Sequence, residues 1–219
     1  VWSIIIPLLL GVYFIKKLSL DSVFIFLVIV TGAVPQLLSV FTENRSLLNV
    51  TYNLYTLIEF VLVYLLLERF ISQRKYLFKL TGFLYVSITI WFILNYGIVN
   101  DFLNDLVCVN NILYIVMILY ILIEQLENED DKEFLLQFKK HFFWYILAIF
   151  LYSASTLMVF SMWNYVKTHN SAYIQNIWII HHVFNFLMYA LFAGGFIVDS
   201  KLDMEKLKFY NPIFYSKKH

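Results

Sequence analysis

Seven long apolar runs make up most of this 219-residue chain, and they leave few folds open to it. A helix needs about 20 consecutive apolar residues to cross the hydrocarbon core of a bilayer. Charged residues amount to only 14% of the chain, whereas a soluble domain usually has about 25%. Membrane barrels show segments of about 10 residues that alternate in polarity, and these runs are longer and apolar on both faces. The sequence therefore predicts an all-α integral membrane protein, a bundle of seven transmembrane helices.

The bundle is expected to form a single domain over residues 1–198, followed by a short tail at 199–219. In the tail, apolar side chains interleave with lysines, a pattern typical of a helix that lies on the inner leaflet. The expected spans are Val1–Ile15, Leu20–Phe41, Leu47–Leu67, Tyr76–Val99, Phe102–Ile123, Phe142–Trp163 and Tyr173–Val198.

The distribution of basic residues predicts the orientation. Loops on the cytoplasmic side of a membrane protein carry an excess of Lys and Arg. With the N-terminus outside and the C-terminus in the cytoplasm, fourteen of the sixteen Lys and Arg residues fall on the cytoplasmic side, and only Arg45 and Lys167 do not. An even number of helices would break this alternation of basic and non-basic loops. We therefore expect a multi-pass membrane protein with an odd number of helices in this orientation.

Ionisable groups at membrane depth are costly and usually functional, so they are the main guide to a site. Glu59 is the one such group near the middle of the third run. Tyr52, Tyr55 and Glu59 share a helical face, and Asn53 lies on the adjoining stripe. The seventh run carries a second polar stripe. We expect these two faces to enclose a ligand-binding pocket that opens outward, formed by Glu59, His181, His182, Asn185, Asn53, Tyr55, Tyr52 and Trp178.

A purely structural role for the same residues stays open, because buried Glu, His and Asn side chains can tie helices together by hydrogen bonds. The ionisation state of Glu59 is also left open, since attraction to an imidazolium and desolvation act in opposite directions.

The sequence argues against several known kinds of seven-helix protein. A retinal protein needs a lysine in its last helix, and the stretch 172–198 has none. The adjacent His181 and His182 point about 100° apart on a helix, so a three-ligand zinc site is not assembled. Haem would need histidines that face each other on two helices, and the sequence does not place them so. Cys108 is the single cysteine and therefore cannot form an internal disulfide. We expect no metal, no cofactor and no enzymatic activity.

A carrier is a closer alternative. The pair Pro35-Gln36 resembles the pair of the PQ-loop carriers, which also have seven helices, but the second Pro-Gln pair of that family is absent.

Three short motifs stand out: the run 53–60 (NLYTLIEF), the run 143–153 (FWYILAIFLYS), and the run 178–181 (WIIH) continuing to Asn185 and 190–193 (ALFA). They resemble a group of uncharacterised seven-helix inner-membrane proteins of Bacteroidetes-type bacteria. The resemblance implies a multi-pass protein of the bacterial inner (cytoplasmic) membrane, and a stand-alone sensor module that works beside histidine kinases. The doubled His181-His182 departs from the pattern of the group and leaves open which imidazole faces the pocket.

The function expected from these features is that of a non-enzymatic membrane sensor. It would bind a small ligand, a lipid or a proton in the pocket and pass a helix movement to a membrane or cytoplasmic protein partner. The alternatives are a small-solute or proton-coupled transporter and an accessory subunit of a larger membrane complex. The net charge of only +1 gives the chain no strong positive potential, so we do not expect it to bind nucleic acid.

Overall fold

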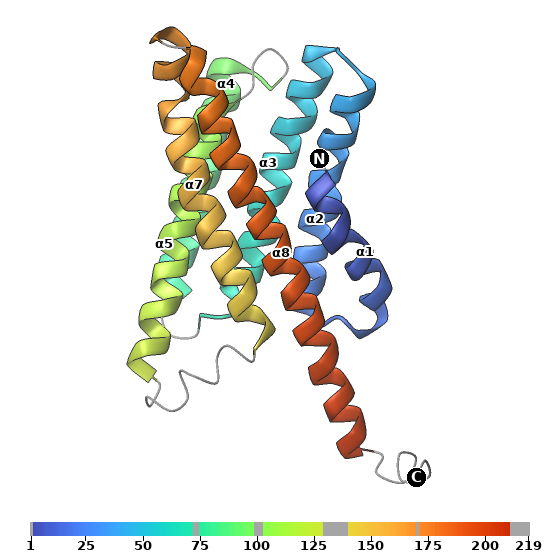
Figure 1. Cartoon of the computed structure of the whole chain (residues 1–219). Coiled ribbons are helices and arrows are strands. Elements are labelled where there is room, and N and C mark those ends of the chain that lie inside the picture. The colour runs from blue at the N-terminus through green and yellow to red at the C-terminus, as the bar shows by residue number, and fades with distance from the viewer. Residues whose placement is uncertain (1, 72–74, 99–102, 129–139, 170, 211–219) are drawn as a thin grey trace.

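The chain folds as an elongated bundle of α-helices (Figure 1). The computed structural model describes residues 2–71, 75–98, 103–128, 140–169 and 171–210, and no strand occurs among them. Two short 3-10 helices, η1 (Trp2–Ile4) and η2 (Ile15–Lys17), flank the first α-helix. The α-helices of the described residues are α1 (Ile5–Phe14), α2 (Leu20–Phe41), α3 (Arg45–Glu68), α4 (Lys75–Tyr96), α5 (Asn104–Asn128), α7 (His141–His169) and α8 (Ser171–Tyr210).

Six of these helices, α2, α3, α4, α5, α7 and α8, are long and apolar enough to cross a membrane. The all-helical, multi-pass membrane architecture predicted from the apolar runs is therefore confirmed. The α2 helix has the predicted ends, and the ends of α3, α4, α5 and α7 differ by one to six residues. The first run forms only a ten-residue α-helix, which rises about 15 Å.

The last helix differs most from its predicted boundary. Instead of ending at Val198, α8 continues without a break to Tyr210 and projects beyond the rest of the bundle (Figure 1). The charged residues from Asp199 onward had suggested a boundary, but they continue the helix. The predicted placement of this tail on the inner leaflet stays a prediction.

Side-chain caps help to position the first two long helices. The Ser19 hydroxyl accepts a hydrogen bond from the Ser22 amide at the start of α2. The Asn44 side chain accepts one from the Leu47 amide at the start of α3. Each cap satisfies a backbone donor that has no partner within the helix. The three-residue connection at 42–44 makes α2 and α3 an antiparallel pair.

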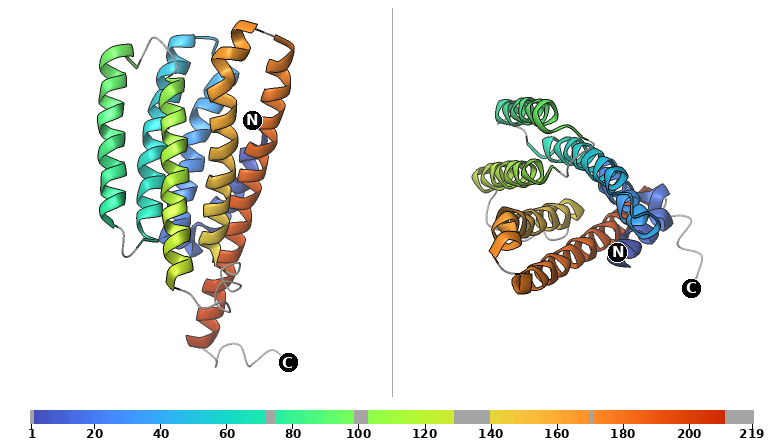
Figure 2. Two further views of the ribbon diagram at one scale, coloured as in Figure 1. Left: turned by 90° about the vertical axis from the view of Figure 1, so that its left-hand side faces the viewer. Right: turned by 90° about the horizontal axis from the view of Figure 1, so that it is seen from above.

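The helices form two hairpins with further helices beside them. The α7–α8 and α2–α3 pairs pack most extensively, α5 packs against α7, and α1 packs against α8. The view from above shows α4 at the edge of the bundle, next to α3 and α5 (Figure 2). The last helix thus contacts the first two, and α8 closes the bundle.

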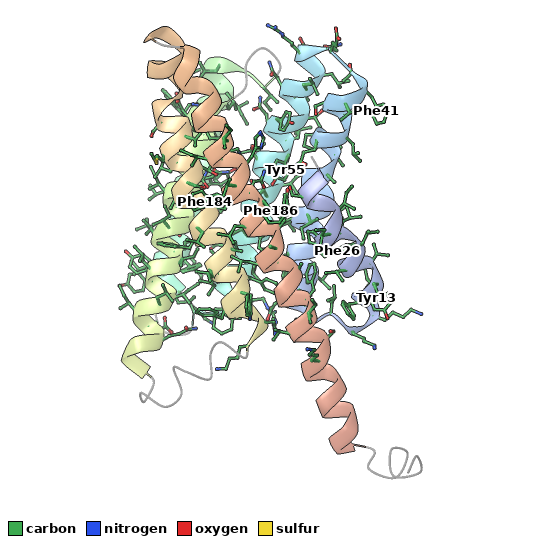
Figure 3. All side chains as sticks on the ribbon, viewed as in Figure 1. Tyr13, Phe26, Phe41, Tyr55, Phe184 and Phe186 are labelled. Atoms are coloured by element: carbon green, nitrogen blue, oxygen red, sulfur yellow. The ribbon has the colours of Figure 1, made fainter. Side chains whose placement is uncertain are left out.

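Apolar side chains cover the outside of the bundle as well as its inside. Tyr13 is 79% exposed and Phe41 is 82% exposed, and both point away from the helices (Figure 3). Rows of exposed apolar side chains also follow α2 and α4, among them Leu27, Val34, Leu37, Phe83, Val86 and Ile90. A surface of this kind suits lipid rather than water.

The interior differs between the two ends of the bundle. The end where α2 and α7 begin is filled by a tight apolar core. The largest fully buried side chains lie in this half, except for Leu106 near the start of α5: they are Ile25, Ile29, Leu66, Leu67, Phe78, Met117, Ile118, Ile121, Tyr145, Phe192 and Phe196. The opposite half holds most of the buried polar residues.

Candidate functional site

A cavity of about 1060 Å³ lies in the half of the bundle that contains the α2–α3 connection. Pockets for small molecules usually have volumes of about 300–1,000 Å³, so the space suits a small organic ligand. Its rim includes the exposed residues Ser39, Tyr96 and Asp105, which open it at this end of the bundle. Six helices contribute to its wall, with Gln36, Tyr52, Tyr55, Thr56, Glu59, Phe92, Asn104, Tyr152, Phe160, His181, His182, Asn185, Phe186 and Tyr189 among the lining residues.

Glu59 lies deep in this cavity, about 21 Å along the axis of α3 from Arg45. Tyr55, one helical turn earlier, is placed to donate a hydrogen bond to its carboxyl group. The ring of Tyr55 packs against Gly32 of α2, where an added Cβ atom would lie only 3.1 Å from the ring. Gly32 therefore makes room for the tyrosine, and Figure 3 shows Tyr55 on the inner side of α3.

Tyrosines from five helices surround Glu59. The charge of its carboxylate would act on each of their phenol groups. Two of them, Tyr85 and Tyr114, stack on the ring of Phe60, with ring centroids 3.4 Å and 5.6 Å from that of Phe60. The five are Tyr55 on α3, Tyr85 on α4, Tyr114 on α5, Tyr152 on α7 and Tyr189 on α8.

The polar stripe of α8 faces the same cavity, as its helical spacing predicted. The sequence left open which of the two adjacent histidines faces the pocket, and both imidazoles line the cavity. His181 is the buried one, with its ring centroid 5.9 Å from those of both Tyr152 and Phe160. His182 is exposed. One turn further on, the Asn185 Oδ1 atom is buried and has no hydrogen-bond donor among the described residues.

A contact between α2 and α8 that the sequence did not reveal closes one side of the cavity. The Gln36 Nε2 atom donates a hydrogen bond of 3.2 Å to the Tyr189 hydroxyl. Gln36 follows Pro35, and α2 continues through both residues. The Pro-Gln pair thus belongs to the wall of the cavity.

Asn53, which we expected in the pocket, is buried and is not among the residues that line the cavity. A role for Asn53 in ligand binding stays a prediction. Its Nδ2 atom donates to the Ile98 carbonyl at 2.8 Å, and its Oδ1 atom accepts from the Leu103 amide at 3.0 Å. The side chain points inward, as expected, but it holds the two ends of the α4–α5 connection. The side chain of Trp178 lies outside the described residues.

A second polar cluster lies at the opposite end of the bundle, and the sequence analysis missed it. The Asp199 Oδ2 atom of α8 accepts hydrogen bonds from the Ser19 amide at 2.7 Å and from the Ser22 hydroxyl at 2.5 Å. Because Ser22 donates to Asp199, it accepts from the Tyr145 hydroxyl, 2.6 Å away. His141 Nδ1 lies 3.3 Å from Asp199 Oδ1. These contacts join the start of α2 to α7 and α8.

The cluster continues to α3 through Asp21. His141 Nε2 lies 3.5 Å from Asp21 Oδ2, and Arg69 Nε lies 2.5 Å from Asp21 Oδ1. We call this chain of contacts the Asp199 network; it consists of Ser19, Asp21, Ser22, Arg69, His141, Tyr145 and Asp199. One sequence signal pointed to it, since Asp199 follows Phe192 and Phe196 on the same buried face of α8.

The described residues contain no group of three or more His, Cys, Asp or Glu side chains that could hold a metal ion. The chemistry that the cavity offers is therefore carried by one deep carboxyl group, several phenols, imidazoles and amides.

No protein-family model, curated protein or solved structure matches this chain.

Proposed function

We propose that this chain is a sensor of the bacterial inner membrane that binds a small ligand in the Glu59 cavity and signals to a protein partner. In this proposal the chain has seven spans, its N-terminus lies outside and its C-terminus lies in the cytoplasm. The observation that carries the proposal is the cavity itself. It is open at one end of the bundle, and Glu59 and the tyrosines around it line its deep end.

The charges at the two ends of the bundle support the orientation. Lys16, Lys17, Lys75, Lys140 and Lys201 belong to the end with the Asp199 network, whereas the cavity opens near Arg45. By the positive-inside rule the basic end faces the cytoplasm, so the cavity faces outward.

The path of α8 supports signalling. The helix lines the cavity at His181 and Asn185, passes through the apolar core at Phe192 and Phe196, joins the network at Asp199 and ends at Tyr210. A ligand that shifts the upper part of this helix by 1–2 Å would move its far end as well. A partner that contacts the projecting end would then receive the signal.

The alternatives receive less support. An accessory subunit would be expected to have the Glu59 region closed by packing, but this region is open. A carrier needs a route to both sides of the membrane, and the described residues that line the cavity belong to its outward half. The core around Tyr145 and Phe196 fills the other half.

The signalling role can be tested by filling the cavity. We expect Asn185→Trp to shift the distance between spin labels on Lys75 and Lys201, measured by pulsed EPR in nanodiscs, by about 2 Å. Both labelled positions are exposed at the basic end. Ile179→Trp is the matched control, because Ile179 is 60% exposed on the same helix and does not line the cavity. An equal distance in both variants would contradict the coupling that a sensor requires.

The orientation can be tested by thiol labelling in a Cys108→Ala background. We expect a membrane-impermeant maleimide added to intact spheroplasts to label Glu43→Cys but to label Lys201→Cys only after lysis. Both side chains are exposed, Glu43 in the α2–α3 connection and Lys201 on α8. The reverse pattern would place the cavity on the cytoplasmic side and would contradict the proposal.

A further inference from the structure

The residues of the cavity wall indicate which class of ligand it binds. This inference rests on the proposed function, in which the cavity binds a small molecule. The described lining residues include two carboxylates, Glu59 and Asp105, and no Lys or Arg. Glu59 is at the deep end, and Asp105 is exposed at the rim. No described Lys, Arg or His forms an ion pair with Glu59, and its partner within the described residues is Tyr55. The deep carboxyl group is therefore available to a cation.

The aromatic side chains of the wall suit the same class of ligand. The faces of aromatic rings attract ammonium groups, and they do so more strongly in desolvated sites. Tyr55, Tyr152 and Tyr189 lie around Glu59 and also line the cavity, and Tyr52 lies one turn from Tyr55. A carboxylate enclosed by tyrosines combines charge with a surface for an apolar body.

Two further acceptors distinguish an amine with N–H groups from a fully alkylated cation. The Oδ1 atoms of Asn104 and Asn185 are buried, line the cavity and have no donor among the described residues. The orientation of Asn104 is defined, because its Nδ2 atom donates to the Phe160 carbonyl at 3.2 Å. A buried acceptor without a donor is costly, and a ligand that supplies N–H donors removes that cost.

We infer that the ligand is an organic primary amine with an apolar, preferably aromatic, body. Its ammonium group binds Glu59, its body packs against the tyrosines, and Asp105 at the rim attracts the cation toward the cavity.

The test compares three indole compounds of similar size: tryptamine, which carries an ammonium group, tryptophol, which carries a hydroxyl, and indole-3-propionate, which carries a carboxylate. Binding to the full chain in nanodiscs is measured with radiolabelled tryptamine and competition by the other two, with empty nanodiscs subtracted. We expect tryptamine to bind about tenfold more tightly than tryptophol, and indole-3-propionate to bind most weakly.

Two variants and one control assign this preference to Glu59. Glu59→Gln should remove the advantage of tryptamine over tryptophol. Asn185→Lys, which adds an ammonium group to the cavity wall, should weaken tryptamine about tenfold or more. Glu43→Gln removes an exposed carboxylate at the same end of the bundle and should change nothing. Circular dichroism and gel-filtration elution volume show whether each variant is folded. If Glu59→Gln does not fold, Asn185→Lys still tests the proposal.

Equal or tighter binding of tryptophol or indole-3-propionate would overturn the amine assignment but leave a ligand-binding cavity. Absence of binding by all three compounds would also overturn it. The spin-label experiment with Asn185→Trp needs no added ligand, so failure of the sensor proposal is recognised separately.

Discussion

Asp199→Ala is expected to lower the free energy of unfolding by about 2–4 kcal/mol, because each buried donor left without an acceptor costs about 1–3 kcal/mol. Asp199 is 5% exposed and accepts from the Ser19 amide and the Ser22 hydroxyl. The His141 Nδ1 atom lies 3.3 Å from its other carboxylate oxygen, Oδ1. Alanine would leave these donors without an acceptor in a region of low dielectric, where each unmet group is costly. The measurement is an SDS titration of the protein in mixed micelles, followed by circular dichroism.

The neighbouring Ser200→Ala is the matched control. Ser200 is equally buried, but its hydroxyl bonds to the Ile197 carbonyl within α8. A bond of this kind contributes little to helix association, so the control should lose no more than about 1 kcal/mol. Asp199→Asn keeps the shape and one acceptor, and it should fall between the two. If Asp199→Ala were no less stable than Ser200→Ala, the network would not contribute to the packing of the bundle.

Gly195→Ala is expected to destabilise the bundle by about 3 kcal/mol, because overpacking is combined with loss of a hydrogen bond. A Cβ atom at Gly195 would lie 2.2 Å from Cε1 of Tyr145. The tyrosine ring is completely buried, and its hydroxyl is held by Ser22. The ring therefore cannot move aside without breaking its contact with the Asp199 network. The same SDS titration measures the loss.

The adjacent glycine provides a control of the same chemistry. A Cβ atom at Gly194 would lie 3.4 Å from Cε3 of Trp144, which is an ordinary contact. Gly194→Ala should therefore be neutral or stabilising, because alanine favours a helix over glycine by up to about 1 kcal/mol. In a Tyr145→Ala background, Gly195→Ala should cost little, since the clashing ring is gone. An equal loss with and without Tyr145 would show that steric overlap is not the cause.

The sequence predicts the helices well because the bilayer dictates their length and apolar character. For α2 the predicted and observed ends coincide, and α8 is the exception because a helix that leaves the membrane need not stop there. Helical spacing also predicted which side chains face inward. It brought together Glu59, Tyr55, His181 and Asn185 on facing helices, and these residues line one cavity.

What the sequence could not predict depends on which helices are neighbours. Asn53 points inward as its spacing indicates, but its partners, Ile98 and Leu103, depend on where α4 ends and α5 begins. The Asp199 network requires α2, α7 and α8 to meet at one end. Hydropathy carries no information on such pairings, and charged residues at the ends of apolar runs look like ordinary boundaries.

The contact between Ser19 and Asp199 also has a consequence for the biosynthesis of the protein. The two residues are 180 positions apart, so the hydrogen bonds of Asp199 to the start of α2 form only after nearly the whole chain has been synthesised. Until then, the Ser19 amide and the Ser22 hydroxyl lack this acceptor, and contacts so distant in sequence are slow to form. A chain that stops before its final helix would keep these groups exposed. These unpaired donors would distinguish an incomplete copy from the finished protein.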